Sequence, residues 1–248
     1  MADWNENRTR PGLGTSQGFT GAAVPRTGEV FDAGLRKHML SIYNYMTSGV
    51  LLTGIVAALT ASSGLAAQMQ GSPIMWLIIL SPLAIVFAMS FGANKFSKTT
   101  LQAMFWAFAT LMGLSLSTIF LVYTGGSIAA TFFATAAAFA GLSLFGYTTK
   151  KDLSGIGSFL IMGVVGLIVA MVINIFLQSP ALMYAISFIG VLIVAGLTAY
   201  DTQRLKEQYA YVRGTEFAGK AVVLGALTLY LDFINMFQFL LSFMGSRE

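Results

Sequence analysis

The sequence contains no cysteine and a single histidine, His38. Without cysteine there is no disulfide, no thiolate nucleophile and no zinc–thiolate site. One histidine cannot build a multi-histidine metal site or the paired histidines of a zinc protease helix. These residues support no enzyme class, and we expect a non-enzymatic protein without a cofactor.

Charged residues are also scarce. They make up 10% of the 248 residues, whereas 56% are hydrophobic, and a typical soluble domain has about 25% charged residues. So few charges cannot cover a surface that faces water, so lipid must cover much of this one. The hydrophobic runs are continuous rather than alternating, which argues against a membrane β-barrel. The predicted fold class is therefore an all-α integral membrane protein.

Seven hydrophobic stretches are long enough to cross a hydrocarbon core of ~30 Å at 1.5 Å per residue. They predict a seven-transmembrane helical bundle over residues 39–248. The polar residues 1–38 are predicted to form a flexible cytosolic N-terminal tail. The predicted spans cover residues 43–66, 74–92, 101–123, 127–147, 156–177, 181–201 and 221–244.

The basic residues predict the orientation of the bundle. Every Lys and Arg except Arg247 lies in the N-terminal tail or in the segments that follow the second, fourth and sixth spans. Lys and Arg are enriched in cytoplasmic loops, so the N-terminus is expected in the cytosol. Because the basic residues are spread over such loops, no nucleic-acid site is indicated.

Two carboxylates stand out because they lie within the spans. Asp201 ends the sixth span and Asp232 lies inside the seventh. A carboxylate near the bilayer centre costs about 3 kcal/mol on insertion scales, so it usually faces the protein interior and is often functional.

Polar residues share a face with each carboxylate. On a helical projection of the seventh span, Thr228, Asp232, Asn235 and Gln238 fall on one stripe of roughly 140°. Thr198 shares a face with Asp201 in the sixth span. The seventh span is therefore expected to face the bundle interior or a water-filled cavity and to be the central helix.

The residues leave two interpretations of the carboxylates open. If they meet, they would share a proton, and loss of that proton would create repulsion and expose ligands for a transient Ca²⁺. Alternatively, Asp201 interacts with Arg204 or Lys206 at a helix end, and Asp232 is a buried, hydrogen-bonded structural residue.

Two motifs in the last spans resemble those of a known family. The run ALTLYLDFIN at residues 226–235 resembles the signature of the Bax inhibitor-1 family, also called TMBIM. The run AYDTQ at residues 199–203 resembles the aspartate motif of that family's sixth helix. The similarity extends in order over about residues 35–246, and the tail and loops look bacterial.

The resemblance implies six helices around a central C-terminal helix and a pH-sensitive calcium leak gated by Asp201 and Asp232, with calcium as the permeant ion. It also implies a basic residue near the cytosolic end of the second helix that engages the pair. This chain has no arginine there, and Lys95 is the nearest match. We expect the bacterial inner membrane as its location, with the lipid bilayer and calcium ions as partners. The alternative is a non-conducting regulator of a membrane-anchored AAA protease or another membrane partner.

Overall fold

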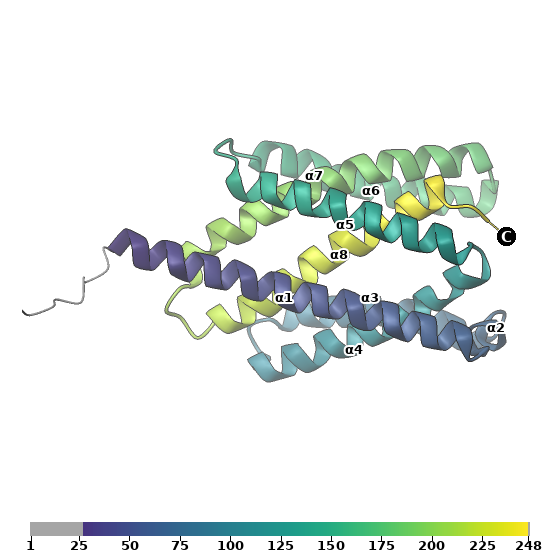
Figure 1. The fold of residues 1–248 in the computed structure, drawn as a ribbon, viewed down its shortest axis with the longest axis horizontal. Helices are drawn as coiled ribbons and strands as arrows, with labels where there is room; N and C mark the ends of the chain where they lie inside the picture. The colour runs from purple at the N-terminus through teal and green to yellow at the C-terminus, as the bar shows by residue number, and fades with distance from the viewer. Residues whose placement is uncertain (1–26, 248) are drawn as a thin grey trace, which may run out of the picture.

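The computed structural model describes residues 27–247, which are almost entirely helical (Figure 1). Seven helices are long and apolar enough to cross a membrane. They are α1 (Thr27–Ser62), α3 (Pro73–Gly92), α4 (Lys98–Leu116), α5 (Gly125–Thr148), α6 (Ser154–Leu177), α7 (Pro180–Val212) and α8 (Ala218–Met244). A short helix α2 (Leu65–Met69) follows α1, and a 3-10 turn η1 (Ser117–Leu121) continues α4. The predicted seven-transmembrane bundle is confirmed.

Several helices begin where the sequence carries helix-starting residues. Pro73 and Pro180 occupy the first positions of α3 and α7, where a missing backbone N–H costs nothing. The side chain of Ser179 accepts a hydrogen bond from the backbone N–H of Leu182. Asp152 Oδ1 accepts one from the backbone N–H of Ser154 at 2.8 Å and so supports the start of α6.

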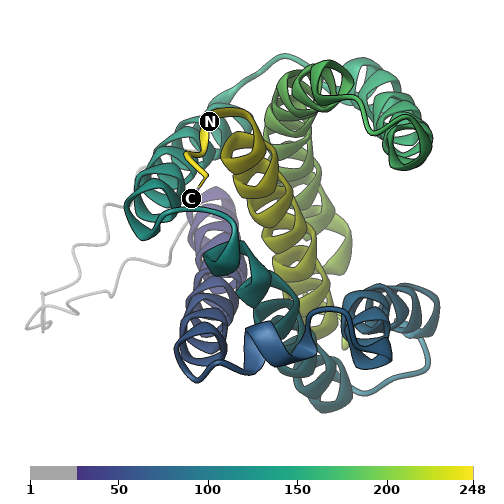
Figure 2. The same cartoon turned by 90° about the vertical axis from the view of Figure 1, so that its right-hand side faces the viewer.

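Helix α8 lies in the centre of the bundle (Figure 2). It packs against α7, α1, α5 and α4, whereas α3 packs mainly against α4 and α6 mainly against α7. The largest buried side chain, Tyr230, belongs to α8 and meets the rings of Phe105 and Phe108 edge-on, with centroids 6.1 and 5.1 Å away. Its hydroxyl also forms a 2.6 Å hydrogen bond with Thr53 Oγ1 of α1. The predicted central position of the C-terminal helix is confirmed.

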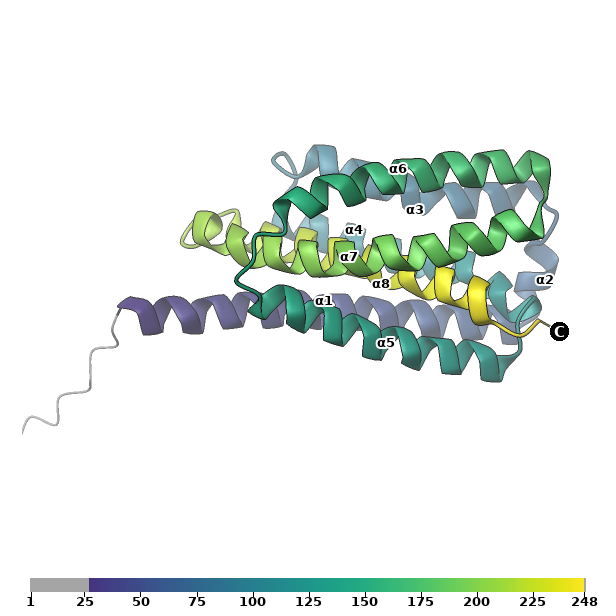
Figure 3. The same ribbon diagram turned by 90° about the horizontal axis from the view of Figure 1, so that it is seen from above.

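The connections that carry basic residues gather at one end of the molecule, which we call the basic end. There Lys220 Nζ donates to the carbonyl oxygens of Ala93 and Asn94 at 3.4 Å, and Gln203 Nε2 donates to that of Lys151 at 2.8 Å. The C-terminus lies at the opposite end (Figure 3). Since α8 runs between the two ends, it crosses the whole bundle.

At two places the helices extend well beyond the predicted spans. Helix α1 begins at Thr27, so residues 27–38 of the predicted tail are helical, and the rest of that tail lies outside the described residues. Helix α7 continues past residue 201 to Val212. The hydrophobic runs predict only the part of each helix that crosses the hydrocarbon core, and both helices extend beyond that part as polar turns.

Candidate functional site between helices α7 and α8

Asp232 is a buried acid in the middle of the central helix. Its side chain is 6% exposed, and its Oδ2 has no hydrogen-bond partner within the part of the chain that the structure describes. It lies about 21 Å from the start of α8 and about 18 Å from its end at 1.5 Å per residue. A buried carboxylate is expensive unless it is paired or protonated.

Asp201 of α7 lies beside Asp232. The two carboxyl groups are close enough for a hydrogen bond between them when one is protonated, and Asp201 is half-buried. Asp201 lies about 17 Å before the end of α7, and Asp232 about 21 Å after the start of α8. The antiparallel helices therefore bring the acids to nearly the same depth, because α7 continues to Val212.

The positive charge that acts on Asp201 is Arg204, which lies one turn further along α7. Lys95 is exposed in the turn between α3 and α4. Among the side chains that the structure describes, neither carboxylate forms an ion pair with Lys95 or any other basic residue. A contact between Lys95 and the acids stays a prediction.

The other predicted polar residues separate into two places. Thr198 is fully buried in α7 and donates to the carbonyl oxygen of Val194 at 2.9 Å. Thr228 is half-buried and donates within its own helix, to the carbonyl oxygen of Leu224 at 3.2 Å. Asn235 and Gln238 are exposed on a flank of α8 that other helices leave uncovered. The stripe therefore runs from the buried Asp232 to an open flank, and Thr198 lies apart from that flank.

Two carboxylates are too few for a resident metal ion. Over residues 27–247, no group of three or more His, Cys, Asp or Glu side chains is placed to hold a metal. Ca²⁺ takes six to eight oxygen ligands, so most of its ligands here would have to be carbonyl oxygens and water. Transient binding of Ca²⁺ by Asp201 and Asp232 stays a prediction.

A chain of hydroxyl groups that the sequence analysis missed ties three helices together near this site. Tyr43 Oη of α1 and Ser143 Oγ of α5 are 2.6 Å apart, and Ser143 Oγ is 2.9 Å from Thr202 Oγ1 of α7. The three residues lie in separate spans, so no sequence pattern links them. The one available signal was that Thr202 directly follows Asp201 in the chain.

Comparison with known proteins identifies the family of this chain. The family model described as Inhibitor of apoptosis-promoting Bax1 matches residues 35–248. An uncharacterised protein of Caulobacter vibrioides is 50% identical over 229 residues, which cover 88% of this chain and 91% of that protein. The inner membrane protein YbhL of Escherichia coli is 45% identical over 220 residues, which cover 87% of this chain and 94% of YbhL.

The match therefore includes all seven long helices from residue 35 onward, and with them both Asp201 and Asp232. The relatives align over nearly their whole length. The chain belongs to the Bax inhibitor-1 family of membrane proteins.

Proposed function

We propose that this protein is a pH-sensitive cation leak pathway of the Bax inhibitor-1 type, with Asp201 and Asp232 as its gate and Ca²⁺ as its permeant ion. The observation that supports this most strongly is the pair itself: a buried acid with an unpartnered oxygen lies level with a second acid and without an ion pair. Such a pair holds one proton more readily than none, because two close negative charges in a low-dielectric site repel each other.

The proton controls the contact between α7 and α8. With one proton, the carboxyl groups share a hydrogen bond that holds the helices together. Without it, both carboxylates are negative, and the repulsion is relieved when the helices separate or a cation enters. Raising the pH therefore opens the pathway, and lowering it closes the pathway.

The exposed flank of α8 offers a route for the cation. Asn235 and Gln238 lie there, with Thr228 at its edge, and their side-chain oxygens are the hard ligands that Ca²⁺ prefers. Lys95 would act as a mobile counter-charge when α3 approaches the acids. This role makes the protein a transporter-like pathway rather than an enzyme.

The proposed location is the bacterial inner membrane, with the N-terminus in the cytosol. The name of YbhL supports this membrane, and the gathering of basic residues at the basic end supports the orientation. A cysteine introduced in the α5–α6 connection should be labelled only from the cytosolic side, and labelling from outside would reverse the orientation.

The gate is tested by calcium flux into liposomes that contain the purified full-length chain. Flux through the wild type should rise with pH. Asp232→Asn and Asp201→Asn should each lose the pH response, because one titratable partner is gone. The matched control is Asp152→Asn, which removes an exposed acid from the α5–α6 connection and should keep the wild-type response.

An unchanged pH response in both aspartate variants would refute the gate. Deletion of residues 1–26, which leaves α1 intact, separates the leak from the alternative of a regulator that acts through its tail. The leak should persist in the deleted chain, whereas binding of a protease partner through the tail should be lost.

A further inference from the structure

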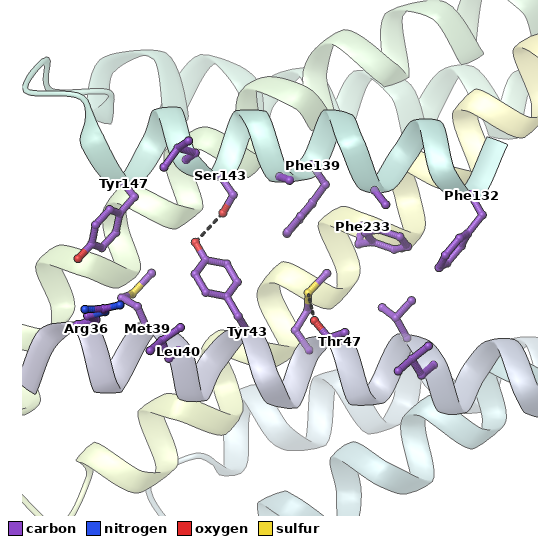
Figure 4. Close-up of a pocket in the computed structure, with 16 residues that line it drawn as sticks. Arg36, Met39, Leu40, Tyr43, Thr47, Phe132, Phe139, Ser143, Tyr147 and Phe233 are labelled. Atoms are coloured by element: carbon purple, nitrogen blue, oxygen red, sulfur yellow. Dashed lines mark hydrogen bonds between the residues drawn. The ribbon is translucent and has the colours of Figure 1, made fainter. Parts of the chain in front are cut away.

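A lateral groove separates α1 from α5 (Figure 4). Its volume is about 710 Å³, and aliphatic and aromatic side chains from both helices form most of its walls. Phe139 of α5 and Phe233 of α8 lie along it, and Tyr43 reaches across to Ser143 (Figure 4). The bond from Tyr43 to Ser143, continued to Thr202, ties α1 to α5 and α7 and fixes the distance between the groove walls.

The groove has the length of a lipid leaflet. Its lining on α1 runs from Arg36 to Leu51, which is about 22 Å of helix and exceeds the ~15 Å of one half of the hydrocarbon core. Leu40, Leu51 and Leu144 line it and are 50%, 56% and 63% exposed. The groove is therefore open sideways, toward the lipid.

Charge is concentrated at one end of the groove. Arg36 and Tyr147 lie near each other there (Figure 4). Lys206 Nζ donates to the carbonyl oxygen of Tyr147 at 2.7 Å and lies 5.2 Å from the centre of its ring. Among residues 27–247, no acidic side chain lines the groove. The basic end of the molecule thus places two positive charges at the mouth of an otherwise apolar groove.

We propose that this groove binds one anionic phospholipid from the leaflet at the basic end. One acyl chain lies along Leu40, Tyr43 and Phe139, and the phosphate lies at Arg36, whose planar guanidinium suits phosphate oxygens. Lys206 adds positive potential at the mouth. The inference uses no residue of the aspartate pair and stands independently of the proposed leak.

The distribution of charge favours a phospholipid as the occupant. Arg36 lies at one end of the groove, and aliphatic and aromatic side chains form most of its remaining walls. A phospholipid carries its negative charge at one end of long apolar chains and so matches both features.

Native mass spectrometry of the detergent-purified full-length chain tests this proposal. The delipidated protein is titrated with phosphatidylglycerol or with phosphatidylcholine that carries the same acyl chains. The wild type should retain one phosphatidylglycerol in preference to phosphatidylcholine. Arg36→Gln should reduce that preference about fivefold, the effect expected for one basic residue near an anionic headgroup. Lys37→Gln changes the next, exposed residue, which does not line the groove, and should keep the preference.

A second pair of variants tests the groove itself. Ala140→Trp places a large ring in the groove and should remove the retained lipid, whereas Ala138→Trp, on an exposed part of α5 outside the groove, should not. Circular dichroism and gel filtration verify that each variant is folded. If Ala140→Trp is not folded, the Arg36→Gln and Lys37→Gln variants alone decide whether the groove binds an anionic lipid.

Several results would overturn the proposal. Three concern the lipid: equal retention of the two lipids by the wild type, equal effects of the Arg36 and Lys37 substitutions, and undiminished lipid retention by folded Ala140→Trp. A dimer mass that Ala140→Trp abolishes would assign the groove to a second copy of the chain and would overturn the proposal as well.

Discussion

Helix α6 lies at the periphery of the bundle and helix α8 at its centre, although hydropathy alone would suggest the reverse. Helix α6 has the highest mean hydropathy of the seven, and α8 has nearly the lowest. Yet Phe159 and Phe176 of α6 are 69% and 84% exposed, whereas Tyr230 of α8 is 0% exposed. Lipid tails are as apolar as leucine, so hydrophobicity does not drive a helix inward here. The central position of α8 rests on close packing, because its buried residues are mostly apolar and contact four other helices, whereas its polar residues Asn235 and Gln238 are exposed.

One glycine in each helix shows how the closeness of neighbouring side chains can differ. A Cβ added at Gly225 of α8 would lie 2.9 Å from Leu205 Cδ2 and 3.1 Å from Ile42 Cδ1, and one added at Gly166 of α6 would meet nothing within 4 Å. Small residues let helix backbones approach each other. Gly225 therefore serves close packing in α8, whereas Gly166 does not serve it in α6, where Gly157 and Gly163 are the glycines that face α7.

The largest difference between the two helices is expected in the loss of unfolding free energy when an aromatic side chain is truncated to alanine. Tyr230→Ala removes a fully buried ring and should lower the free energy of unfolding by about 3 kcal/mol or more. Phe159→Ala in α6 should change it by less than about 0.5 kcal/mol. Unfolding in mixed detergent micelles, followed by circular dichroism, measures both. Equal losses would show that α6 packs as tightly as α8.

A smaller difference is expected for added volume. Gly225→Leu should destabilise the fold by about 1–3 kcal/mol, since the new side chain must displace Leu205 and Ile42. Gly166→Leu should leave the unfolding midpoint unchanged, because its Cβ faces open space. The same unfolding assay applies, and a destabilised Gly166→Leu would show that α6 has a packing partner on that face.

The smallest effect on stability is expected at the start of α6, where exposed Asp152 accepts a hydrogen bond from Ser154. Hydrogen bonds from Ser154 lower the pKa of Asp152 from its ordinary value of 3.8. Its stabilising contribution is therefore present above that value and lost as the pH falls through the lower pKa of the folded protein. The unfolding midpoints of wild type and Asp152→Asn should differ slightly at neutral pH and converge in strong acid. A difference that persists in acid would show that the charge is not responsible.

Part of the candidate site followed from residues close together in the chain. The helical projection correctly placed Asp232 on the inner side of a central helix, because helical periodicity fixes which residues share a face. Periodicity does not fix which helix each face meets. For that reason the projection did not predict that Asn235 and Gln238 are exposed on α8, although they share a stripe with the buried Asp232, or that Thr198 is fully buried in α7.

The sequence by itself determined the seven spans and their alternating direction, because hydrocarbon thickness fixes span length and basic residues mark alternate connections. Only the tertiary structure decided that Asp201 and Asp232 lie level, since this depends on the polar extension of α7 to Val212. It also decided the groove between α1 and α5, whose walls come from residues about a hundred positions apart. Local sequence patterns determine where each helix lies in the chain and which way it crosses the membrane. Packing between residues far apart in the sequence determines which helices contact one another.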